Sequence, residues 1–156
     1  MKMKKRRVVY TIGHSNRSKE GFISLLHRFG IEALVDVRRF PTSKYEHFRK
    51  ENLQEMLRKE GIDYVHMEEL GGFRDGGYVE YTKTKEFNQA IKRLARLARR
   101  KTLALMCSER FYWRCHRRFV ARVLKAMGFE VIHIIDENRV VKERRELRVE
   151  RVSKKR

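Results

Sequence analysis

The sequence predicts an α/β fold, a single-domain Rossmann-like three-layer sandwich around a mostly parallel sheet of about five strands. The chain has 156 residues, the usual size of one domain. Apolar runs of strand length alternate along it with segments of helical periodicity. Strands separated by amphipathic helices favour parallel pairing and right-handed crossovers. We expect the domain to span residues 8–136, between a basic N-terminal extension, 1–7, and a charged C-terminal tail, 137–156.

The first third of the chain predicts a strand, a helix and a second strand. Residues 8–12 form a β-branched and aromatic run that ends at Gly13. The following helix is capped by Asn16 or Ser18, and its apolar residues recur at i, i+3, i+4 and i+7. A second apolar run, 33–37, predicts the next strand, which ends in a basic turn.

The middle of the chain continues the alternation. A second helix is expected around Glu51 to Glu60, followed by a short third strand at 62–67. The segment 70–77 carries four glycines and is predicted to be a loop. Apolar residues between Phe87 and Ala98 recur at helical spacing and predict the third helix.

The last third supplies two more strands. Residues 102–107 form the most apolar run, typical of a strand covered on both faces. A helix is expected from about Cys115 to Met127, and a final strand at 131–135. The charged tail, 137–156, is predicted to be a frayed helix or disordered.

The chain is strongly basic, with 39 Lys and Arg against 20 Asp and Glu and a net charge of +19. Much of the excess lies at the ends: residues 1–7 carry +5, and residues 137–156 hold nine basic and four acidic residues. Such a charge attracts nucleic acids through their phosphates. Surface solvation and ion pairing explain the same composition, which with 38% charged residues is similar to that of hyperthermophile proteins. We favour the second interpretation and still expect weak adhesion to nucleic acid.

Other features predict a cytoplasmic protein with no membrane partner. No apolar run approaches the roughly 18 residues that a bilayer-spanning helix needs. The basic N-terminus leads only into the short apolar stretch 8–12, shorter than the apolar region of a secretory signal. The two cysteines, Cys107 and Cys115, do not make a disulfide framework of the secreted kind.

Polar and ionisable residues follow every predicted strand, where ligands of such sheets bind. The candidate catalytic residues are His14, Asp36, Cys107, Glu109, Cys115 and His116. The candidate substrate- or anion-binding residues are Gly13, Ser15, Arg38, Ser43, Gly71, Gly72 and Arg117. Polar loops are common for the simple reason that loops are exposed. A histidine between Gly and Ser, or a cysteine at the end of a buried strand, is less well explained in that way.

The first two strand ends have two interpretations each. Gly13 permits close backbone approach to a ligand, and Ser15 with the free N–H groups of the next helix suits an anion. His14 is a candidate acid, base or metal ligand, or a helix-capping residue. Asp36 and Arg38 point to the same side of their strand. They form either a structural salt bridge or a unit in which Asp36 orients Arg38 onto a phosphate or carboxylate.

The segment that follows the fourth strand is the richest. A strand-end cysteine before a helix is typical of thiol enzymes of the rhodanese and phosphatase type. The spacing differs here, because the position six after Cys107 is Trp113 instead of an arginine, and the loop has no glycine. A small buried core residue is the alternative role for Cys107. The aromatic run Phe111 to Trp113 could stack a base or pin the loop.

The start of the last long helix offers N–H groups and the side chain of Arg117 to an anion. Sulfur and imidazole donors for a metal exist in Cys107, Cys115, His116 and His14. The adjacent residues Cys115 and His116 diverge on a helix, however, and no paired Cys-x-x-Cys motif occurs. We therefore predict no metal site, leave the cofactor open, and consider a Cys107–Cys115 redox pair weaker still.

Five short motifs occur together in one order. They are Gly13-His14-Ser15, Asp36-Val37-Arg38 with Pro41 and Ser43, Leu70-Gly71-Gly72, Cys107-Ser108-Glu109 and Cys115-His116-Arg117. In these motifs the chain resembles the family known as domain of unknown function 488, over about residues 8–135. The resemblance implies a small prokaryotic α/β domain with its site at these motifs, and it implies no particular reaction. A fainter similarity to rhodanese lies in the Asp-Val-Arg strand end and the strand-end cysteine.

Three functions follow as hypotheses. The first is an enzyme for a phosphorylated or other anionic substrate, with His14 or Glu109 as acid or base and Arg38 and Arg117 as anion clamps. The second is a nucleic-acid-binding or nucleic-acid-processing module, and the third is a rhodanese-like thiol sulfurtransferase acting through Cys107. The expected partner is an anionic small molecule or a nucleic acid, and the oligomeric state is left open. The first hypothesis requires one cleft that gathers His14, Asp36, Arg38, Glu109 and His116.

Overall fold

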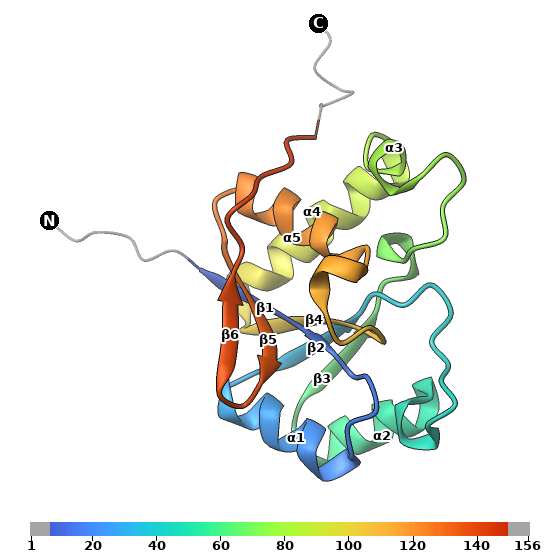
Figure 1. Cartoon of the computed structure of the whole chain (residues 1–156), viewed down its shortest axis with the longest axis vertical. Coiled ribbons are helices and arrows are strands. Elements are labelled where there is room, and N and C mark those ends of the chain that lie inside the picture. Colours follow the sequence, from blue (N-terminus) through green and yellow to red (C-terminus); the bar gives the residue numbers. More distant parts are fainter. Residues whose placement is uncertain (1–6, 150–156) are drawn as a thin grey trace, which may run out of the picture.

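The computed structural model describes residues 7–149, and these form a six-stranded sheet between two layers of helices (Figure 1). The strands are β1 (Val8–Gly13), β2 (Ala33–Asp36), β3 (Asp63–His66), β4 (Leu103–Cys107), β5 (Glu130–Asp136) and β6 (Arg139–Lys142). The helices are α1 (Lys19–Arg28), α2 (Lys50–Lys59), α3 (Tyr78–Tyr81), α4 (Lys85–Arg100) and α5 (Arg117–Ala126). Short 3-10 turns lie at Glu46–Phe48, Glu68–Leu70 and Tyr112–Arg114.

The order of strands across the sheet is β3-β2-β4-β1-β5-β6. The first five are parallel, so their carboxyl ends meet at one edge. The predicted Rossmann-like three-layer α/β sandwich with a mostly parallel sheet is therefore confirmed. Within residues 7–149, no helix combines the length and the apolar character that crossing a bilayer requires.

Each helical layer covers one face of the sheet and buries its own core. Helices α1 and α2 pack with even-numbered residues of β1, β2 and β4, such as Ile12, Leu34 and Met106. Helices α4 and α5 lie on the other face with odd-numbered residues, such as Val35 and Leu105 (Figure 1). Successive residues of a strand point to opposite faces, so the same alternation decides to which face each residue at the strand ends belongs.

The helix starts follow from local chemistry. Ser18 caps α1, because its hydroxyl oxygen accepts a hydrogen bond of 3.0 Å from the Gly21 N–H. Thr84 caps α4 in the same way through the Phe87 N–H. The last long helix begins at Arg117, two residues later than expected, because a 3-10 turn occupies Tyr112–Arg114.

The expectation for the C-terminal tail was wrong where the structure describes it. Residues Arg139–Lys142 are strand β6, which pairs antiparallel with β5, and the N–H of Asn138 is held by the Asp136 carboxylate in the turn between them. Beyond β6, Glu143 is buried, and Leu147 packs on the core. The domain thus extends past residue 136. Residues 1–6 and 150–156 of the two predicted extensions lie outside the described residues.

Candidate functional site

The strand alternation divides the candidate residues and their buried polar partners into two clusters, one on each face of the sheet. We call the first the ion-pair cluster: it contains His14, Asp36, Arg38, Tyr64 and His66. We call the second the thiol cluster: it contains Thr11, Cys107, Cys115, His116, Arg117, His133 and Glu143. The first lies on the face that α1 and α2 cover, and the second on the face that α4 and α5 cover.

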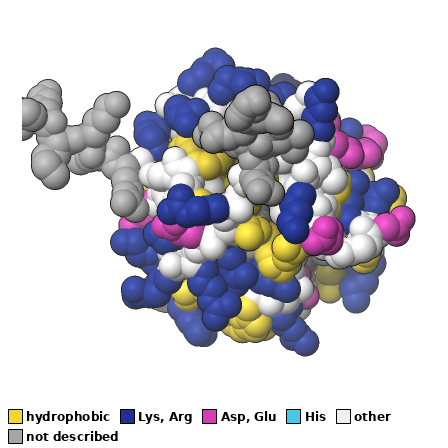
Figure 2. Space-filling view, turned by 90° about the horizontal axis from the view of Figure 1, so that it is seen from above, with side chains coloured by type: hydrophobic (Ala, Val, Ile, Leu, Met, Phe, Trp, Pro, Cys, Tyr) yellow, Lys and Arg dark blue, Asp and Glu magenta, His cyan; other side chains and the backbone are white. Residues whose placement is uncertain are grey.

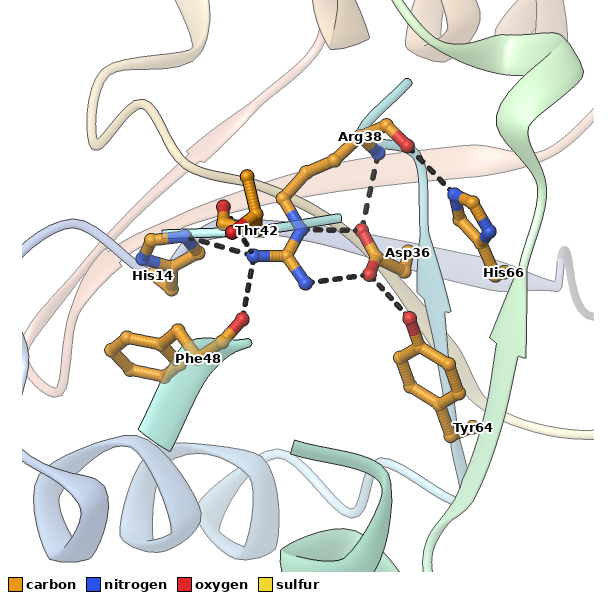
Figure 3. A network of polar contacts seen from close by, with 7 residues as sticks. All are labelled: His14, Asp36, Arg38, Thr42, Phe48, Tyr64 and His66. Atoms are coloured by element: carbon orange, nitrogen blue, oxygen red, sulfur yellow. Dashed lines mark hydrogen bonds and ion pairs between the residues drawn. The ribbon is translucent and has the colours of Figure 1, made fainter. Parts of the chain in front are cut away.

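A buried salt bridge between Asp36 and Arg38 is the centre of the ion-pair cluster (Figure 3). The guanidinium binds both carboxylate oxygens, with Nε–Oδ1 and Nη2–Oδ2 distances of 2.8 Å. Its Nη1 donates to the carbonyl of Phe48 at 2.7 Å and to that of Thr42 at 3.3 Å. Asp36 is 0% exposed and also accepts from the hydroxyl of Tyr64. Arg38 is thus engaged with internal partners, as the structural-salt-bridge interpretation requires.

His14 lies beside this pair, stacked on the ring of Phe48 with centroids 4.3 Å apart. Its Nδ1 is 2.9 Å from the carbonyl oxygen of Ser15, which can only accept, so Nδ1 carries the proton. Its Nε2 is therefore the acceptor in the 3.5 Å hydrogen bond from Arg38 Nη1. Burial, aided by the charge of Arg38, lowers the pKa of His14 to about 4, so the imidazole is neutral near pH 7.

An open pocket of about 470 Å³ lies in front of His14. It is lined by His14, Ser15, Asn16, Thr42, Ser43, Lys44, Tyr45 and Ser108. These residues come from the loops after β1, β2 and β4. Backbone hydrogen bonds from His14 to Cys107 and from Ser15 to Ser108 fix the first loop against the third. Ser15 has a φ of 48°, a strained conformation for a residue with a side chain, as often found at functional sites.

The thiol cluster brings the two cysteines into contact. Cys107 Sγ and Cys115 Sγ are 2.7 Å apart, and Arg117 Nη1 donates to Cys107 Sγ at 2.7 Å. Burial alone would raise the pKa of Cys107, but the hydrogen bond from Cys115 and the charge of Arg117 outweigh it and lower this pKa. The pKa of Cys115 is raised, because its proton is held by Cys107 and because it is buried. An arginine from the first turn of α5, Arg117, thus lies against the cysteine that ends β4.

Arg117 does not reach the pocket, and it is 0% exposed. Its Nε donates to Thr11 Oγ1 at 3.1 Å, and Thr11 in turn contacts His133 Nδ1 at 2.6 Å. His133 Nε2 binds the carboxylate of Glu143 at 2.8 Å. Since a carboxylate accepts, the hydrogen bonds run in one direction, from Arg117 through Thr11 and His133 to Glu143. Burial opposes the charge of Glu143, but its hydrogen bonds to His133 and the Arg145 N–H lower its pKa.

His116 joins the two clusters through the backbone. Its Nε2 donates to the carbonyl of Val37 at 2.9 Å, which leaves the Nδ1 lone pair 3.6 Å from Cys115 Sγ. Burial lowers the pKa of His116 to about 4. A Cβ on Gly72 would lie 3.0 Å from His116 Nδ1, and one on Gly71 would lie 2.6 Å from the backbone of Arg39. These glycines permit close packing of the 70–72 loop and do not line the pocket.

The remaining candidates act mainly through the backbone. The carbonyl of Glu109 accepts from Arg117 Nη1 at 2.6 Å. A Cβ on Gly13 would lie 1.8 Å from that carbonyl oxygen, so glycine is required there. Among residues 7–149, no group of three or more His, Cys, Asp and Glu side chains is placed to hold a metal ion.

The site therefore differs from the single cleft expected from the sequence. The structure brings together His14, Asp36 and Arg38, but it places Glu109 and His116 with the thiol cluster. Sequence reasoning missed Thr11, Tyr64 and Glu143. A polar residue inside a buried strand was the available signal for Thr11, while the charged surroundings of Glu143 concealed its burial.

The buried histidines predict a stability that falls in mild acid. In the unfolded state the two histidines bind protons below their ordinary pKa of 6.5. In the folded state His14 and His116 bind them only near pH 4. Stability therefore rises with pH across this window, by on the order of 2–3 kcal/mol per histidine. Urea denaturation at about pH 4.5 and about pH 7 measures the difference. This difference in stability should be smaller in His14→Gln and unchanged in His27→Gln, a control at an exposed histidine. Equal unfolding midpoints of the wild-type chain at both pH values would contradict the lowered pKa values of the buried histidines.

The fold and the polar residues at one edge of its sheet define the class of protein. The chain is a small doubly wound α/β domain with polar residues at the carboxyl ends of its parallel strands. Comparison with family profiles then gives the family. The profile described as Domain of unknown function DUF488 matches residues 18–77 and 73–124, more than half of the chain, and the chain belongs to this family. Comparisons with curated proteins and with solved structures find no significant match.

Proposed function

We propose that the chain is an enzyme that binds a phosphorylated or otherwise anionic substrate in the pocket beside His14. The composition of the pocket lining supports this proposal most directly. Among its eight residues, five carry hydroxyl groups, one is Lys44, and none is acidic. Hydroxyl groups and an ammonium group are the donors that phosphate and carboxylate oxygens accept from.

His14 is the candidate for proton transfer in this pocket. Its Nε2 can take a proton once its 3.5 Å contact with Arg38 Nη1 is released, but a pKa of about 4 makes the empty site a weak base. An anion bound next to the ring would favour the imidazolium and raise this pKa toward neutrality. The buried pair of Asp36 and Arg38 holds the ring from behind. Binding of the anionic substrate would thus make His14 a stronger base.

Inorganic phosphate tests the proposal. We expect phosphate to bind the full chain, to shift the ¹⁵N resonances of His14, and to raise its pKa. Replacement of Lys44 by alanine should weaken binding by on the order of tenfold, about 1.4 kcal/mol. The matched control is Lys59→Ala, which removes the same charge at the end of α2, outside the pocket. Equal weakening by both variants would show that phosphate responds to net charge alone.

Nucleic-acid binding is the second candidate, and the basic surface favours it. Figure 2 shows Lys and Arg side chains spread over the face seen from above, where α4 and α5 lie. Exposed residues of α4 on this layer include Lys92, Arg96 and Arg100. This surface is distinct from the pocket, so Lys44→Ala should leave any nucleic-acid affinity unchanged, and that affinity should fall steeply with salt. Sulfur transfer would need a substrate to reach Cys107, which is 3% exposed and does not line the pocket.

A further inference from the structure

The two cysteines of the chain lie in contact although seven residues separate them. We propose that Cys107 and Cys115 form a reversible dithiol–disulfide centre, which hydrogen peroxide oxidises and thiols reduce again. Cys107 is the attacking thiolate, and Cys115 resolves the oxidised form. This centre goes beyond the proposed anion-binding function and uses none of the pocket side chains.

The geometry places the two sulfur atoms for bond formation. Cys107 ends β4, and Cys115 caps the 3-10 turn Tyr112–Arg114 two residues before α5 begins, so both are held by regular structure. At 2.7 Å, no heavy atom fits between the sulfurs, and a disulfide requires only a small further approach. The side chains are 3% and 7% exposed. A small oxidant such as hydrogen peroxide therefore suits this site better than a protein disulfide.

The charge of Arg117 indicates which sulfur is the thiolate. Its guanidinium is fully buried, and a buried charge needs a counter-charge. The acceptors that it contacts are Thr11 Oγ1, the carbonyls of Glu109 and Arg110, and Cys107 Sγ. Of these four, only the sulfur can ionise near neutral pH. Cys107 is thus the anion that faces Arg117.

The environment of Cys115 suits a resolving thiol. It keeps its proton, which it shares with the Cys107 thiolate. The unprotonated Nδ1 of His116 lies 3.6 Å from its sulfur and can accept that proton when Cys115 attacks. An ionised thiol and a protonated thiol beside a neutral imidazole give the two cysteines different roles.

The reaction balances in two steps. The Cys107 thiolate attacks one oxygen of hydrogen peroxide, an S–O bond forms as the O–O bond breaks, and the departing hydroxide takes a proton from solvent. Cys115 then gives its proton to His116 Nδ1, and its sulfur attacks that of Cys107. An S–S bond forms as the S–O bond breaks, and the hydroxide takes the proton back from His116. The two thiols are oxidised, and one peroxide becomes two waters.

Arg117 also makes the disulfide easy to reduce. Oxidation removes the negative charge of Cys107 and leaves the buried guanidinium without a counter-charge. The dithiol form is therefore stabilised relative to the disulfide, as in oxidising thiol enzymes and unlike structural disulfides. Two molecules of a small monothiol such as 2-mercaptoethanol return the centre to its reduced form, and they become one molecule of the corresponding disulfide.

The test is treatment of the reduced full chain with hydrogen peroxide, followed by alkylation and intact-mass measurement. We expect loss of both alkylatable thiols and of two hydrogen atoms, reversed by a small thiol such as 2-mercaptoethanol. Cys115→Ser should stop at a sulfenic acid on Cys107 that dimedone traps. Cys107→Ser should react slowly, with the rate of an ordinary buried thiol. Oxidation of both single variants at equal rates, or a wild-type chain that keeps both thiols, would overturn the proposal.

The role of Arg117 has a matched control. Arg117→Lys should slow oxidation near pH 7 by on the order of tenfold, because the thiolate loses its forked partner. Arg114→Lys makes the same change at an exposed position in the same segment and should leave the rate unchanged. In the wild-type chain, the pH midpoint of Cys107 alkylation should lie below the ordinary value of about 8.5. A midpoint at or above that value would also overturn the proposal, and Lys44→Ala, which affects only the pocket, should not change it.

Discussion

Replacement of Arg117 by methionine is expected to lower the free energy of unfolding by about 3–5 kcal/mol, the range for breaking a buried charged network. The guanidinium is 0% exposed and binds Thr11 Oγ1, two backbone carbonyls and the Cys107 sulfur. Methionine fills part of the volume but supplies no donor, so these acceptors are left buried and unpaired. Urea denaturation near neutral pH measures the loss as a lower midpoint with an unchanged slope.

The control for this prediction is Arg114→Met, which removes an exposed arginine three residues earlier. It should change stability by no more than about 0.5 kcal/mol. A similar small change in Arg117→Met would mean that the buried network contributes little to folding. It would also remove the electrostatic reason for a thiolate at Cys107.

The second large effect is expected at the other cluster. Asp36→Asn keeps the shape of the side chain but leaves the buried Arg38 without its counter-charge, which should cost about 3–5 kcal/mol. The amide also offers one oxygen where the carboxylate offers two, so the forked contact and the hydrogen bond from Tyr64 cannot both be kept. Thermal or urea unfolding gives the difference directly.

Two further variants show whether the loss of stability in Asp36→Asn comes from a buried, unpaired charge. Glu55→Gln breaks the exposed pair with Arg58 and should leave stability nearly unchanged, because water screens that pair. The double variant Asp36→Asn with Arg38→Met should be more stable than the sum of the single effects predicts, because it leaves no unpaired buried charge. Strict additivity of the two single changes would show that Asp36 and Arg38 are not energetically coupled.

The fold could be predicted from the sequence because its main elements obey simple periodicities. The apolar strand at 102–107 and the amphipathic helix around Phe87 to Ala98 both appear in the structure, with shifts of one or two residues. Strand β6 could not be predicted in this way, because Val140 and Val141 lie within a charged segment. Only pairing with β5 and burial of Glu143 against His133 show that this segment is part of the domain.

The candidate site was predictable as a set of strand ends but not as a set of contacts. His14, Ser15 and Ser43 do line one pocket, because the parallel strands that they follow, β1 and β2, flank β4 and end at the same edge of the sheet. The inward direction of Arg117 was not visible, because the first turn of a helix normally faces solvent or a ligand. The contact of Cys107 with Cys115 depends on the path of the 108–116 segment, and no local pattern encodes that path.

Strand β6 also has a consequence for how copies of the chain meet. It forms one border of the sheet, and its outer backbone groups are the kind that can template a strand from another molecule. Arg139 and Lys142 stand at its two ends, both exposed, on a molecule whose net charge is +19. Pairing of two such edge strands would bring positively charged side chains close together at a partly desolvated interface. The positive charges of Arg139 and Lys142 thus oppose aggregation of the chain through strand β6 in concentrated solution.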